Sequence, residues 1–121
     1  MAAIDLRAAS KTGWVHTQAS VATTWQQYQI PSWCNQVTVL GDAIVYVAGE
    51  ENGNPASSES PADGGAVGTH RIEIPASTAY PVGIQGDPVQ VTVGGGASPS
   101  GSIFVAAKTG TATVTLQLER V

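Results

Sequence analysis

The stretch GTATVTLQLERV, residues 110–121, alternates apolar and polar side chains along its length. Its apolar positions are Ala112, Val114, Leu116 and Leu118. A period of two is typical of a β-strand with one face on a core and the other in solvent. The sequence therefore predicts a strand over residues 112–120. Its outer face is mostly threonine, with little charge to deter pairing with another chain.

Good helix-forming stretches are almost absent from the chain. Fourteen glycines and seven prolines are spread over 121 residues, and only residues 2–11 keep helix formers together. Turn-forming residues bound each of the strand-like runs. The expected strands are residues 25–30, 36–40, 43–48, 70–74, 80–84, 89–93, 102–107 and 112–120. We therefore predict an all-β chain with a single β-sandwich or jelly-roll-like domain of about eight antiparallel strands.

Two segments lie outside these predicted strands. Residues 1–23 show little periodicity, and we expect them to form an extended N-terminal arm beside a β-sandwich domain over residues 24–121. Deletion of residues 1–20 is then expected to leave a folded domain. Residues 49–68 contain acids and no base, which is typical of a long exposed loop. Gly41-Asp42 and residues 108–111 have the length of tight hairpin turns.

The charge content of the chain is low. Charged residues make up 12% of the sequence, the net charge is −4, and the five basic residues are scattered. We expect no nucleic-acid partner, because there is no basic patch to neutralise phosphates. The apolar runs are far shorter than a membrane span, so no membrane partner is expected either. The N-terminus lacks the apolar core of a signal peptide.

No group of residues points to catalysis, a cofactor or a metal. His16 and His70 stand in no recognisable setting with a nucleophile. Cys34 is the single cysteine, so it forms no internal disulfide and lacks the paired spacing of a zinc site. We expect it to be a small buried residue. The glycine-rich residues 93–101 lack the lysine and helix of a phosphate-binding loop. We predict a protein that is not an enzyme.

Two predicted strands are apolar on both faces. Val45 and Val47 alternate with other apolar side chains in residues 43–48, and Phe104 does so in residues 102–107. Two stacked sheets cover only one face of each strand. Covering a further valine or aromatic ring is worth about 1.5–3 kcal/mol. The cover comes from the chain's own arm or loop, from a second copy, or from an unrelated partner.

We expect the cover to come mainly from other molecules. Interfaces deplete Lys, Glu and Asp in their cores, and soluble proteins usually carry about twice this charged fraction. Trp14 is expected to anchor the arm against its own domain or a neighbouring one, because an aromatic ring in an unpatterned arm has no local core to enter. The candidate residues for an intermolecular interface are Trp14, Val45, Val47, Phe104, Thr113 and Thr115.

Three stretches resemble small all-β virion proteins of tailed bacteriophages, particularly capsid decoration or cement proteins. They are WQQYQIPSWCNQVTVLG (25–41), HRIEIPAS (70–77) and SIFVAAKTGTATVTLQLERV (102–121). The likeness is one of pattern, so no binding residue is carried over. It implies a non-enzymatic homo-oligomer, most often a trimer, that is made in the host cytoplasm and bridges major capsid protein subunits on the virion surface.

The alternative is a receptor- or carbohydrate-binding module of a phage tail or fibre tip. Aromatic rings stack on sugars, and this reading predicts that some of Trp14, Trp33 and Tyr80 are exposed beside acids at one end of the fold.

Overall fold

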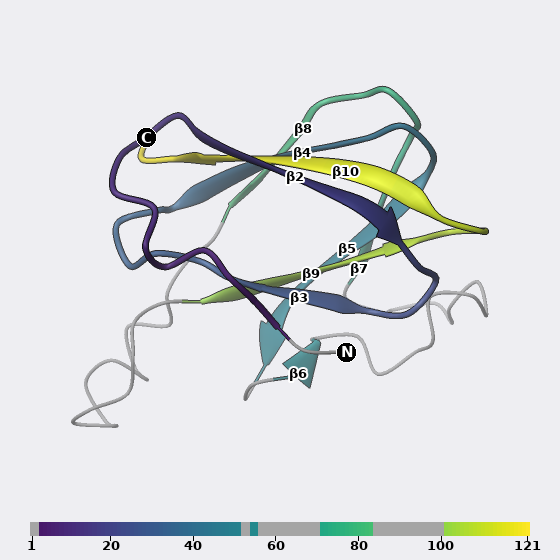
Figure 1. Cartoon of the computed structure of the whole chain (residues 1–121), viewed down its shortest axis with the longest axis horizontal. Coiled ribbons are helices and arrows are strands. Elements are labelled where there is room, and N and C mark those ends of the chain that lie inside the picture. Colours follow the sequence, from purple (N-terminus) through teal and green to yellow (C-terminus); the bar gives the residue numbers. More distant parts are fainter. Residues whose placement is uncertain (1–2, 52–53, 56–70, 84–100) are drawn as a thin grey trace.

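The structure, a computed structural model, describes residues 3–51, 54–55, 71–83 and 101–121 (Figure 1). Every regular element in these ranges is a β-strand, which confirms the all-β class. The strands are β1 (Ile4–Asp5), β2 (Trp14–Val21), β3 (Gln26–Gln29), β4 (Gln36–Gly41), β5 (Val45–Glu51), β6 (Asn54–Pro55), β7 (Arg71–Ile74), β8 (Tyr80–Gly83), β9 (Ser102–Ala107) and β10 (Ala112–Glu119). The strand expected at 89–93 and most of the loop expected at 49–68 lie outside the described residues.

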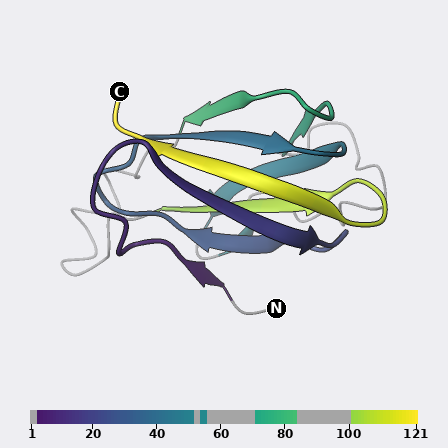
Figure 2. The same cartoon turned by 45° about the horizontal axis from the view of Figure 1, so that its top comes forward.

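The strands form two sheets that face each other (Figures 1 and 2). The four-stranded sheet has the order β2-β10-β4-β8. The six-stranded sheet follows β1-β3-β9-β5-β6, and β7 also pairs with β5. Every pairing is antiparallel except that of β1 with β3.

The longer strands pair in a nested order: strands near the two ends of the sequence pair with each other, and strands nearer its middle pair with each other. The pairs are β2 with β10, β3 with β9, β4 with β8 and β5 with β7. The C-terminal strand β10 also pairs with β4, so it is an internal strand with a neighbour on each side. This position explains how β10 can end the sequence with little charge on its outer face and still expose no backbone edge for another chain to pair with.

The two turns expected to be hairpins instead cross between the sheets. Gly41 ends β4 in the four-stranded sheet, and Val45 begins β5 in the six-stranded sheet. Residues 108–111 likewise connect β9 to β10 across the sandwich. A short turn can form either a hairpin within one sheet or a crossing between two sheets. Turn length does not distinguish them, because in both cases the apolar faces of the flanking strands pack against one core.

The core lies between the two sheets. In β10 the apolar parity predicted from the sequence is buried and the threonine parity is not, which confirms the assignment of its faces. The largest fully buried side chains are Tyr28, Ile30, Ile74, Ile103, Leu116 and Leu118. Burial of each aliphatic side chain of this kind stabilises the fold by about 1.5–3 kcal/mol.

The structure corrects the expected division into an arm over residues 1–23 and a sandwich domain over residues 24–121. β1 lies beside β3, and β2 pairs with β10, so this segment contributes a strand to each sheet. The pattern concealed β2 because His16, which pairs with buried Leu116 and so shares its face, is polar. Deletion of residues 1–20 would remove most of β2 and unpair one side of β10, so that variant is not expected to keep the fold.

A second correction concerns the strands that are apolar on both faces. Val45 and Val47 lie in the core between the sheets, with exposed fractions of 0% and 1%. Phe104, on the opposite parity of β9, is 4% exposed. All three are therefore buried within a single chain, and none requires cover from another molecule. The prediction failed because it took the low charge content as a sign of cover by other molecules and gave less weight to cover by the chain itself.

Candidate interaction surface

The side chains that alternate with the core residues of the four-stranded sheet form its outer face. Strand register fixes the neighbours on this face: Thr115 of β10 lies between Thr17 of β2 and Leu40 of β4. One pleat along, Gln117 lies between Val15 and Thr38. We call this surface the threonine face. It consists of Val15, Thr17, Gln36, Thr38, Leu40, Pro81, Thr113, Thr115, Gln117 and Glu119.

The threonine face carries hydroxyl, amide and methyl groups and a single ionisable side chain. That side chain, Glu119, accepts a hydrogen bond from Thr38 Oγ1 at 3.0 Å. The hydroxyls of Thr17 and Thr115 are 3.4 Å apart across the β2-β10 pair. All of these side chains are half-buried or exposed. The face is therefore polar enough to lie in water and low in charges that would have to be desolvated in a contact.

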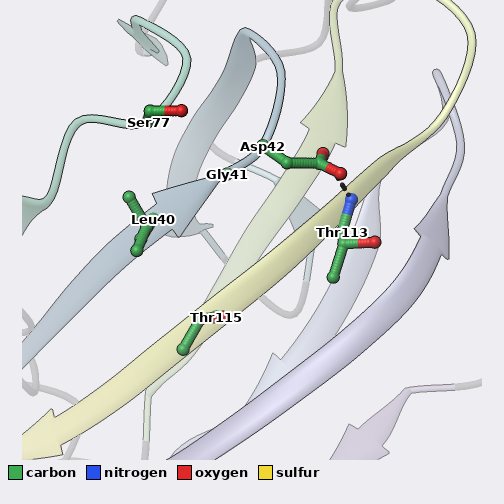
Figure 3. Close-up of a pocket in the computed structure, with 6 residues that line it drawn as sticks. All are labelled: Leu40, Gly41, Asp42, Ser77, Thr113 and Thr115. Atoms are coloured by element: carbon green, nitrogen blue, oxygen red, sulfur yellow. Dashed lines mark hydrogen bonds between the residues drawn. The ribbon is translucent and has the colours of Figure 1, made fainter.

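An open pocket of about 400 Å³ lies at one end of the threonine face (Figure 3). Its lining consists of Leu40, Gly41, Asp42, Ser77, Thr113 and Thr115. The backbone N–H of Thr113 donates to Asp42 Oδ1 at 2.8 Å, which holds this carboxylate at the pocket wall. The backbone N–H of Ser77 donates to the Gly41 carbonyl at 2.7 Å. The described lining residues can hydrogen-bond a polar ligand, and none of them is a histidine, lysine or cysteine.

The structure separates the six candidate interface residues. Thr113 and Thr115 lie on the threonine face beside the pocket. Trp14 is 44% exposed at the start of β2, the edge strand of the same sheet. Val45, Val47 and Phe104 are buried and offer no surface to a partner.

Sequence reasoning missed Val15 and Leu40, two exposed apolar side chains of the threonine face. Leu40 takes the parity opposite to Val37 and Val39, which is a signal that could have found it. Val15 carried no such signal, because β2 itself was not predicted.

The alternative function predicts that some of Trp14, Trp33 and Tyr80 are exposed; Trp14 and Tyr80 are 44% and 39% exposed, but they do not lie at one end of the fold. Trp14 belongs to β2 and Tyr80 to β8, which are the two opposite edges of the four-stranded sheet. Trp33 is half-buried, and its Nε1–H donates to the Ala9 carbonyl at 2.8 Å. No stacking surface is built from these three residues.

Of the residues weighed for metal binding or catalysis, Cys34 and His16 lie in the described part of the chain. Cys34 is buried, as expected, and burial raises the pKa of its thiol, which favours an unreactive group. His16 Nε2 lies 3.1 Å from Gln18 Oε1, and the His16 ring packs edge-on against the ring of Tyr28. His70 lies outside the described residues. Among the described residues, no three His, Cys, Asp or Glu side chains are grouped closely enough to hold a metal ion.

The described part of the chain contains no helix with the length and apolar character needed to cross a membrane. No protein-family model matches the sequence, and no curated protein matches it either.

Proposed function

We propose that this chain is a non-enzymatic structural protein of a tailed-bacteriophage virion, a decoration or cement protein that stabilises the head by bridging major capsid protein subunits. The proposal starts from the resemblance of residues 25–41, 70–77 and 102–121 to such proteins. The structural observation that supports it is the threonine face, a broad surface with one ionisable side chain.

The threonine face has properties suited to burial against another protein. Threonine is β-branched and has few side-chain conformations to lose in a contact. Interface cores are depleted in charged residues, as this face is. The face is also built on four hydrogen-bonded strands, which hold its side chains in a regular arrangement. Contact with a capsid subunit would therefore require little ordering of the chain.

We also propose that the sandwich is a jelly roll. The nested pairs β2-β10, β3-β9, β4-β8 and β5-β7 support this connectivity, in which a long folded-back chain rolls into two sheets. Jelly rolls occur in viral capsid proteins and in lectins. The fold alone is therefore compatible with both a decoration protein and a carbohydrate-binding module, and it selects neither.

To bridge capsid subunits, each bound oligomer of the protein must make more than one contact with the shell. Linked weak contacts strengthen binding by roughly 10²–10⁴ when all can form at once. The resemblance implies a trimer for this purpose. In this proposal the threonine face makes the repeated contact with the shell.

The test is co-sedimentation of the purified chain with capsids assembled from the major capsid protein encoded with it. Thr115→Lys places a charge at the centre of the threonine face, and the proposal expects it to lose most of the binding. Thr109→Lys makes the same change at an exposed turn residue and should bind as the unaltered chain does. Failure of the unaltered chain to pellet with capsids, or equal pelleting of both variants, would overturn the proposal.

The pocket beside Asp42 favours the alternative, a receptor- or carbohydrate-binding module of a tail or fibre tip. Its hydroxyls and carboxylate can hydrogen-bond sugar hydroxyls, but no aromatic side chain is among the residues that line it. Glycan-array screening separates the two functions. Specific binding that Asp42→Ala abolishes would support the alternative, whereas a blank array together with capsid binding supports the decoration protein.

A further inference from the structure

The edge strand β2 differs from the other sheet edges in the described part of the chain. Proteins usually protect sheet edges from pairing by short strands, proline or charge. β1 and β6 are two residues long, and β8 contains Pro81. β7 carries Arg71 and Glu73 in its four residues. Each of these edges has a recognisable protection.

β2 has none of these protections along most of its length. It is eight residues long, contains no proline and no Lys, Arg, Asp or Glu, and has β10 as its one neighbour among the described strands. The sequence holds no charged residue at all from Thr12 to Gly41. Two apolar side chains, Trp14 at 44% and Val15 at 55%, are exposed at this edge.

An irregularity limits the part of β2 that can accept another strand. The register with β10 shifts at the C-terminal end of β2, where Ser20 has a φ of 59°. The register is continuous from Trp14 to Gln18. Bulges of this kind deter pairing locally. The available edge is therefore the straight segment of residues 14–18.

We propose that this segment pairs antiparallel with the same segment of a second copy of the chain, about a two-fold axis close to His16. In such a pair, the side chains beside the axis, from Val15 to Thr17, come near their own copies, so a charge at one of these positions would be repelled by itself. An edge without charge suits a second copy for this reason, whereas a different partner would be selected by complementary charges. Val15 comes to lie opposite Thr17 of the second copy, and Trp14 opposite Gln18, which covers both exposed apolar side chains.

The pairing joins two four-stranded sheets into one continuous sheet, β8-β4-β10-β2 followed by the same strands of the second copy in reverse order. The two threonine faces then lie side by side on one surface. The inference does not rest on the proposed function, because it derives from the edge alone. It also gives a dimer, in contrast to the trimer that the sequence resemblance implies.

The experiment measures the mass of the full-length chain in solution by light scattering over a dilution series. The unaltered chain should have twice the mass of one chain and dissociate on dilution. Thr17→Lys and Thr17→Glu should each have the mass of a single chain, because like charges then meet diagonally across the axis, within reach of these long side chains. An equimolar mixture of the two should recover the doubled mass, because opposite charges now face each other.

Gln117→Lys is the matched control, because Gln117 is exposed on the same face but belongs to the internal strand β10. It should keep the doubled mass, and thermal unfolding should show that all variants are folded. The proposal is overturned if the unaltered chain has the mass of one or three chains at every concentration. It is equally overturned if Thr17→Lys dimerises as well as Gln117→Lys, or if the Lys and Glu variants remain single chains when mixed.

Discussion

Asp42 and Thr113 are joined by two hydrogen bonds, although 71 positions separate them in the sequence. Thr113 N–H donates to Asp42 Oδ1 at 2.8 Å, and Asp42 N–H donates to the Thr113 carbonyl at 3.1 Å. The pair connects the segment that leaves β4 to the beginning of β10. It therefore holds one crossing between the sheets against a strand of the four-stranded sheet.

Asp42→Ala should lower the free energy of unfolding by about 1–2 kcal/mol, because the Thr113 N–H loses its charged acceptor. Asp42→Asn keeps an oxygen that can accept this hydrogen bond and should lose less. Urea denaturation of the three proteins measures the difference. If Asp42→Asn loses as much free energy of unfolding as Asp42→Ala, the hydrogen bond to Thr113 is not what stabilises this turn.

Val47→Ala should lower the free energy of unfolding by about 2 kcal/mol, since it removes buried methyl groups from the core and leaves a cavity. Val121→Ala is the matched control, because Val121 is 75% exposed and its substitution should stay within about 0.5 kcal/mol of the unaltered chain. Chemical denaturation checks both. Equal effects would contradict the burial of Val47 within one chain.

Tyr28→Phe should raise the free energy of unfolding at neutral pH by about 1 kcal/mol. The Tyr28 hydroxyl is buried without a hydrogen-bond partner among the described residues, so its removal relieves a desolvation cost. The ring itself stays in the core. A measured loss of stability would mean that the hydroxyl has a bonding partner in solution.

The same substitution should change the alkaline limit of stability. Burial raises the pKa of Tyr28 from 10.0 to about 12, so the folded chain holds this proton more tightly than the unfolded chain does. The free energy of unfolding should therefore fall as the pH rises from about 10 toward 12. Tyr28→Phe lacks this contribution, and its advantage over the unaltered chain should widen in that range. Parallel stability curves from pH 8 to 11 would argue against the shift.

Gly110→Ala should lower the free energy of unfolding by about 1–2 kcal/mol, because Gly110 has a φ of +62°, where a side chain is strained. Space is not the cause, since no atom lies within 4 Å of the added Cβ. Gly83→Ala has the same free space without the left-handed backbone and should be neutral or slightly stabilising. Thermal unfolding of the pair isolates the backbone effect, and similar losses in both would rule it out.

The sequence determined the local structure where one face of a strand is fully apolar. In β10 the period of two predicted both the strand and its buried parity, and β9 spans the predicted residues 102–107. The buried Cys34 was also predictable from its type. These features follow from residues within one strand, whose alternation shows which side meets a core.

The tertiary structure alone decided which strands pair and what covers each face. β2 was not predictable because an edge strand with His16 and Gln18 on its inner parity is held by its ladder to β10 and buries little apolar surface. Pairings such as Thr17 with Thr115 join residues 98 positions apart, and alternation along each strand does not identify the partner. The enclosure of Val45 and Val47 likewise depended on the tertiary structure, because they belong to a core cluster with residues of other strands, such as Leu116 of β10.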